Sequence, residues 1–165
     1  FTDRTREISS LLFETLNREI VFYDDTAISV NICKDANFVA SNEDTADYVS
    51  YGQDIIEPLF KTSLEGLPHL SITNINTFRK SFLVNYSQAD IADFPDHYLI
   101  EFYRELRKNG YFEAYNYWLF MMGNPREFRA WERDNSSQWS LFIDWFEGYV
   151  FHIKQDDYYY SSQFR

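Results

Sequence analysis

Residues 109–131 read NGYFEAYNYWLFMMGNPREFRAW, and this stretch decides the fold. Between its two glycines, aromatic and long apolar side chains cover nearly every face of a helix. A helix that is apolar on all sides normally lies at the centre of its domain, and this one is too short to cross a bilayer. We therefore expect residues 111–122 to fill the core, with Phe112 and Trp118 buried, in preference to lining a cofactor site.

Helix start and stop signals bracket this stretch on both sides. Gly110 follows a segment with apolar residues at helical spacing, and it suits the left-handed position that ends a helix. Asn124 is a favourable cap, Pro125 suits a first helical position, and Glu127 completes a capping box. Consecutive antiparallel helices are predicted near 95–109, 111–122, 125–134 and 137–153.

The last of these helices carries a regular apolar stripe. Its members are Trp139, Phe142, Ile143, Phe146, Val150 and Ile153. Gly148 interrupts the stripe, either as a weak point or as a site of close packing. The segments 95–122 and 125–153 are each about 30 residues long, near the period of helical-hairpin arrays. Whether they form a true repeat is left open.

The front half gives weaker signals. Residues 3–22 predict a helix capped by Thr2 or Asp3, whose apolar face comprises Ile8, Leu11, Leu12, Leu16 and Ile20. Residues 28–32 alternate as in a short strand, for which no convincing partner is visible. Helical signals resume at Asp54, with Pro58 in the first turn. A break follows at 66–68, and a further helix is expected to be capped by Thr73 or Asn74. Ser87 and Asp90 then suggest a small capping box before Ile91.

Length and composition define the fold class. A chain of 165 residues with 20% aromatic residues and few Gly or Pro favours long helices joined by short turns. We predict a mainly α fold, an antiparallel multi-helix array or bundle with an irregular acidic segment. It is expected to form a single domain over 1–165, with a front part (1–93), a helical back part (94–153) and a tail (154–165).

The charge balance limits the partners. A net charge of −11 argues against direct binding to nucleic acid or anionic lipid, which both attract basic surfaces. The single cysteine, Cys33, cannot form an internal disulfide. The chain is expected to be soluble, and its compartment is left open between the cytoplasm and export with a leader removed before Phe1. No motif indicates a cofactor.

The negative charge is concentrated in residues 24–54. This segment has seven acids and one base, Lys34, so its net charge of −6 is over half of the total. Irregular segments on rigid scaffolds commonly carry function, and clustered carboxylates attract a basic partner. The candidate binding residues are Asp24, Asp25, Glu43, Asp44 and Asp47. The alternative is a solvated loop that only aids solubility.

One group resembles a metal site in composition. His97 and Glu101 are four residues apart on a predicted helix, so they can share a face, and Asp93 lies nearby. The alternative is a polar helix start, where acids are stabilised by the helix dipole. The arrangement of Asp144, Trp145 and Glu147 also resembles a sugar site, although a solvated helix edge with one amphipathic Trp is the favoured interpretation.

These observations favour a non-enzymatic helical domain that binds another protein through an acidic surface. One alternative is a metal-dependent or carboxylate hydrolase that uses His97 and Glu101. Another is a carbohydrate-binding module that uses exposed Tyr and Trp residues. Catalysis by Cys33 is less favoured, because no base neighbours it in the sequence.

Overall fold

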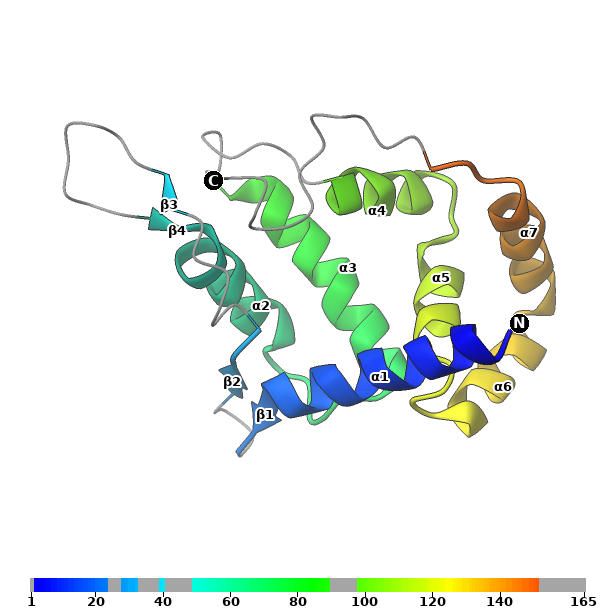
Figure 1. Ribbon diagram of the computed structural model, residues 1–165, viewed down its shortest axis with the longest axis horizontal. Coiled ribbons are helices and arrows are strands. Elements are labelled where there is room, and N and C mark those ends of the chain that lie inside the picture. Colours follow the sequence, from blue (N-terminus) through cyan, green and yellow to red (C-terminus); the bar gives the residue numbers. More distant parts are fainter. Residues whose placement is uncertain (1, 24–27, 33–38, 41–48, 90–97, 152–165) are drawn as a thin grey trace.

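The computed structural model describes residues 2–23, 28–32, 39–40, 49–89 and 98–151. Within these residues, seven α-helices are packed together (Figure 1), which confirms the mainly α fold. The helices are α1 (Asp3–Glu19), α2 (Glu57–Leu64), α3 (Ile72–Gln88), α4 (Tyr98–Lys108), α5 (Phe112–Leu119), α6 (Pro125–Asp134) and α7 (Ser136–Glu147). A π-helical segment, Tyr51–Ile56, leads into α2, where Pro58 lies in the first turn as predicted.

Two short antiparallel hairpins lie in the front half. Strand β1 (Ile20–Phe22) pairs with β2 (Ile28–Val30), and β3 (Val39–Ala40) pairs with β4 (Val49–Ser50). The strand predicted at 28–32 therefore exists, and its partner is the segment that was expected to extend the first helix. Three apolar residues in a row, two of them β-branched, suit a strand better than a last helical turn.

Helix α5 lies at the centre and contacts α3, α4, α6 and α7 (Figure 1). Its buried residues include Phe112, of which only 3% is exposed. The half-buried Trp118 packs against the same core. Phe102 of α4 meets Tyr115 edge to face at 5.4 Å between ring centroids. The prediction that this stretch fills the core is confirmed for Phe112, whereas Trp118, which was predicted to be buried, is only half-buried.

Helix α6 begins and ends where the sequence predicts, and its first turn has a second function. Asn124 caps it by accepting a hydrogen bond from the Glu127 amide at 3.2 Å. The Glu127 carboxylate accepts from the Ile72 amide at 3.1 Å, from the Thr73 amide at 2.8 Å and from the Thr73 hydroxyl at 2.6 Å. A carboxylate at these unsatisfied N–H groups stabilises a helix start, so Glu127 fixes α3 to α6.

Helix α3 differs from the prediction at both ends. Its cap is Ser71, whose hydroxyl oxygen accepts from the Asn74 amide at 3.1 Å, and not Thr73 or Asn74. Ser87, which was predicted to cap a following helix, belongs to the last turn of α3 and donates to the Val84 carbonyl. The other member of the predicted capping box, Asp90, lies outside the described residues, so the box stays a prediction.

The helices predicted at 111–122 and 137–153 are both shorter than predicted. Helix α5 ends at Leu119, and Gly110 has the expected positive φ of 76°, whereas Gly123 does not adopt that conformation. Helix α7 ends at Glu147 with Gly148 as its cap, so Val150, which is 64% exposed, lies outside the apolar stripe. Ile153 is beyond the described residues.

The apolar face predicted for the first helix is buried only in part, since Leu16 packs against the core and Ile20 is buried at the start of β1, but the other three members are not buried. Ile8, Leu11 and Leu12 are 46%, 55% and 37% exposed, while Ser9 is buried. The Ser9 hydroxyl accepts from the Met122 amide at 3.0 Å, and the Phe13 ring rests on Gly123. These contacts place α1 over the turn that follows α5 (Figure 1).

Candidate binding groove

An open groove of about 480 Å³ lies between α3, the end of α4, the start of α5 and α7. Such a volume falls within the usual range for ligand sites. Its walls combine cationic, amide, hydroxyl and apolar side chains. The lining residues are Lys80, Ser81, Val84, Asn85, Arg107, Gly110, Phe112, Glu113 and Gln138.

Helix α3 forms one wall because four of its lining residues follow helical spacing. Lys80, Ser81, Val84 and Asn85 lie at positions i, i+1, i+4 and i+5, which share one side of a helix. Asn85 donates to the hydroxyl of Ser63 on α2 at 2.9 Å. With Glu127 holding the start of α3, this wall is fixed near both ends.

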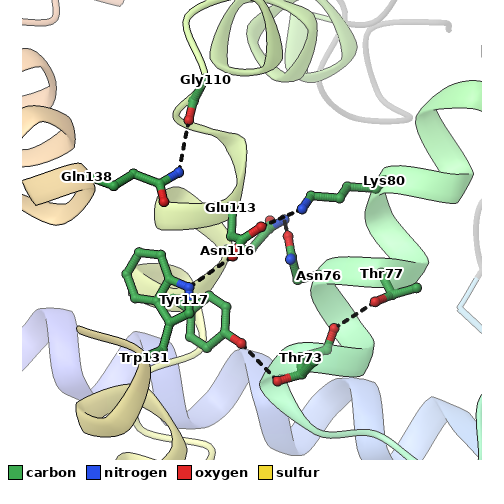
Figure 2. A network of polar contacts seen from close by, with 10 residues as sticks. All are labelled: Thr73, Asn76, Thr77, Lys80, Gly110, Glu113, Asn116, Tyr117, Trp131 and Gln138. Carbon is green, nitrogen blue, oxygen red and sulfur yellow. Dashed lines mark hydrogen bonds and ion pairs between the residues drawn. The ribbon is translucent and has the colours of Figure 1, made fainter. Parts of the chain in front are cut away.

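The opposite side of the groove depends on the turn between α4 and α5. Gly110 adopts φ of +76°, a conformation that side chains with a Cβ rarely take. Its carbonyl accepts from Gln138 Nε2 of α7 at 3.1 Å (Figure 2). This contact joins α7 to the turn and holds the amide of Gln138 beside the groove.

Glu113 is the carboxylate at the centre of this region. Figure 2 shows it between Lys80 of α3, which donates at 2.5 Å, and Trp131 of α6, whose Nε1 donates at 2.9 Å. Burial raises the pKa of Glu113, but the hydrogen bonds from Lys80 and Trp131 outweigh it and leave the pKa below its ordinary value of 4.5. The group is therefore a carboxylate at neutral pH, and it holds Lys80 in place.

Trp131 is itself held by stacking. Its ring lies parallel to that of Tyr117, with 4.4 Å between centroids and an interplanar angle of 10°. The Tyr117 hydroxyl is 2.8 Å from the hydroxyl of Thr73, in the first turn of α3 (Figure 2). The side chains around Glu113 thus form a connected set that spans α3, α5 and α6.

Arg107 is the second cation of the groove. It is exposed on the last turn of α4 and forms no ion pair with any residue that the structure describes. Lys80, by comparison, keeps 45% of its side chain exposed and has a carboxylate partner. The described residues that line the groove therefore include two cations and one carboxylate, and this carboxylate already accepts hydrogen bonds from Lys80 and Trp131.

A buried guanidinium lies on the same helix as Lys80. Arg79 is only 8% exposed, and its Nη1 donates to Asn116 Oδ1 at 2.5 Å. Its guanidinium carbon is 4.5 Å from the ring centroid of Tyr103 and 5.6 Å from that of Phe112. Within the described residues no carboxylate pairs with it, so the aromatic rings and the amide stabilise the charge.

The residues proposed from sequence lie mostly outside the described part of the chain. These are Asp24, Asp25, Glu43, Asp44, Asp47, Asp93 and His97, together with Cys33. Glu101 is described and is exposed on α4. Among the residues described, no three His, Cys, Asp or Glu side chains are grouped closely enough to hold a metal ion.

The suggested sugar site is partly described. Trp145 is half-buried, and its ring lies 5.2 Å from that of Tyr111 and 4.7 Å from that of Tyr149. Asp144 and Glu147 are exposed beside it. The indole is thus part of an aromatic cluster at the edge of the core, and sugar binding there stays a prediction.

The groove residues were missed because each has an ordinary place in an amphipathic helix. Lys80 and Glu113 are 33 positions apart, and Gln138 and Gly110 are 28 apart. No local spacing links them. The one usable signal was Gly110, which predicted a sharp turn at this point.

Comparisons with protein families, with curated proteins and with solved structures give no match. None of the helices in the described segments is both long enough and apolar enough to span a membrane.

Proposed function

We propose that this chain is a non-enzymatic helical domain that binds another protein. The observation that carries the proposal is the preformed groove between α3, α4, α5 and α7, whose walls are fixed by Glu113 and by the contact from Gln138 to Gly110. A site whose side chains are already ordered loses less entropy when it binds.

The shape of the groove favours a protein segment over an enclosed small molecule. Lys80, Arg107 and Gly110 are all exposed, so the groove is open along the surface. Small-molecule sites commonly bury most of their ligand, whereas an open groove accommodates side chains of an extended or helical segment.

The acidic residues Asp24, Asp25, Glu43, Asp44 and Asp47 are proposed to supply a second contact, with a basic surface of the partner. The described residues have 12 basic and 15 acidic side chains, so most of the total of −11 belongs to the remaining segments. Association that these residues steer weakens with salt, because the screening length falls from about 10 Å at 0.1 M to about 3 Å at 1 M.

A groove-filling variant tests the proposal. Ser81→Trp places a bulky ring in the groove, and Ser87→Trp makes the same change at an exposed site of α3 that does not line it. Partners are recovered from the native host with each variant, after equal melting temperatures are verified. We expect Ser81→Trp alone to lose a partner. Equal recovery by both variants and the wild type would refute a binding role for the groove.

A charge variant tests the acidic contribution separately. Replacing the five acidic residues by Asn or Gln is expected to slow partner capture at low salt and to leave the melting temperature nearly unchanged. If capture rates agree with those of the wild type at every salt concentration, the segment does not contact the partner.

A further inference from the structure

The groove has the opposite charge to the chain that contains it. The whole chain has a net charge of −11, and the described residues have −3. Among the described residues that line it, the groove presents Lys80 and Arg107 with one carboxylate, that of Glu113. Because charges separated by more than about 8 Å are largely screened at physiological salt, a ligand in the groove responds mainly to these nearby cations.

Arg107 has donors available for a ligand. It is exposed, and it has no ion-pair partner among the residues described. A guanidinium presents its N–H groups in a planar fork that matches the two oxygens of a carboxylate. Lys80 lies on the same groove, held by Glu113, and an ammonium group has three donors, so it can donate to a second acceptor.

The rest of the lining limits the ligand further. Val84 provides most of the apolar surface, to which the 3% exposed Phe112 adds only a small edge, and Asn85, Ser81 and Gln138 provide neutral hydrogen-bonding groups. A ligand that is only an anion would leave the apolar surface exposed to water, whereas an acidic residue beside an apolar one would use both.

We propose that the groove binds an acidic segment of a partner protein, with a carboxylate on Arg107 and Lys80 and a neighbouring apolar side chain against Val84 and Phe112. This inference rests on the proposed function and names the chemistry of the segment that enters the groove. A short peptide with two or three carboxylates meets the cations without the dense charge of a nucleic acid, which the acidic chain repels.

A synthetic peptide tests this assignment. The probe is a Gly-Asp-Leu-Glu-Gly peptide with a zwitterionic tetramethylrhodamine on its N-terminal amine and an amidated C-terminus, and its Asn-Leu-Gln counterpart, labelled and amidated in the same way, is the neutral control. Binding to the full chain is followed by fluorescence anisotropy at about 0.05 M salt, where surface charges are least screened. We expect saturable binding of the acidic peptide, and much weaker binding of the neutral one.

Two variants with the same change of charge give the decisive comparison. Arg107→Gln removes the cation that lines the groove, and Lys108→Gln removes the adjacent exposed cation that does not line it. We expect Arg107→Gln to weaken the acidic peptide about tenfold, as for loss of a charged hydrogen bond, and Lys108→Gln to weaken it less than about twofold. Arg107→Glu should abolish binding, and Ser81→Trp should block it without any change of charge.

Several results would overturn the assignment. Equal weakening by Arg107→Gln and Lys108→Gln would mean unspecific attraction, and equal binding of the two peptides would mean a purely apolar groove. Tighter binding of inorganic phosphate or of a short single-stranded DNA, lost in Arg107→Gln, would assign the groove to another anion. If the peptide fails while Ser81→Trp still loses its partner, the interaction function stands and only the acidic segment is wrong.

Discussion

Helices α1 and α3 are both 17 residues long, and they are used in opposite ways. Helix α3 buries eight side chains, among them Ile75, Phe78 and Tyr86, whereas α1 buries only Ser9. Both sequences contain apolar residues at helical spacing. The comparison shows that such spacing predicts that a helix forms, while the neighbours of the helix decide which side is buried.

The contacts that position the two helices differ in kind. Helix α3 is held at its start by Glu127 and along its length by the bond from Arg79 to Asn116. Helix α1 rests on a small area, where Ser9 accepts from the Met122 amide and Phe13 touches Gly123. We therefore expect the free energy of unfolding to depend far more on α3 than on α1.

The largest difference should appear when the same truncation is made on both helices. Phe78 of α3 is 2% exposed, and replacing a buried Phe by Ala costs about 3–5 kcal/mol, out of the roughly 5–15 kcal/mol of a typical domain. Phe13→Ala on α1 removes a half-buried ring and should cost clearly less. Urea unfolding of both variants measures the difference, and equal losses would show that α1 is as central as α3.

A second substitution removes the acceptor of the buried guanidinium. Asn116→Leu leaves the Nη1 donor of Arg79 without its partner, and an unsatisfied buried charged group costs about 2–3 kcal/mol. Asn116→Asp supplies a carboxylate to the same donor and should retain more of the stability than the Leu variant. Thermal melts of the two proteins check the order, and the reverse order would mean that Arg79 is stabilised by the rings alone.

Gly123 offers a direct test of how α1 is attached. A Cβ atom at this position would overlap with Cγ of Phe13, so Gly123→Ala must displace the ring. Overpacking of this kind costs about 1–3 kcal/mol. Hydrogen exchange of the α1 amides should accelerate in the variant, and the double variant with Phe13→Ala should lose less stability than the two single losses added together. Additive losses would contradict the contact.

Local signals predicted some of these features, and contacts across the chain decided the others. Asn124 and Pro125 fixed the start of α6 because capping depends on adjacent residues. The end of α5 at Leu119 was missed because the following turn packs on Phe13, which lies more than a hundred positions away. The groove was missed for the same reason, since Lys80 and Glu113 meet only after α3 and α5 have packed.

The hydrogen bonds of Glu113, one of which comes from Lys80 of α3, should make the free energy of unfolding depend on pH. The folded-state pKa of Glu113 is lowered, so its contribution is fully present above the unfolded value of about 4.5 and is lost as the pH falls through the folded pKa. Because Glu113 is about a third exposed, we expect its contribution to the free energy of unfolding to be at most about 1 kcal/mol. The free energies of unfolding of Glu113→Gln and wild type should converge at acidic pH, and a difference between them that does not change with pH would contradict this role of Glu113.

The smallest effect is expected on the outer side of α1. Leu11 is 55% exposed, so Leu11→Glu transfers little buried surface to water and replaces one good helix former by another. Its free energy of unfolding should stay within about 0.5 kcal/mol of the wild type, as for other surface substitutions. Leu83→Glu makes the same change on α3, where the leucine side chain is only 5% exposed, and an unpaired carboxylate in the core should prevent stable folding.

A large loss of stability in Leu11→Glu that depends on protein concentration would mean that another molecule covers α1 in solution. Sedimentation of the wild type would then reveal the complex, and the contrast between the two helices would belong to the isolated chain alone.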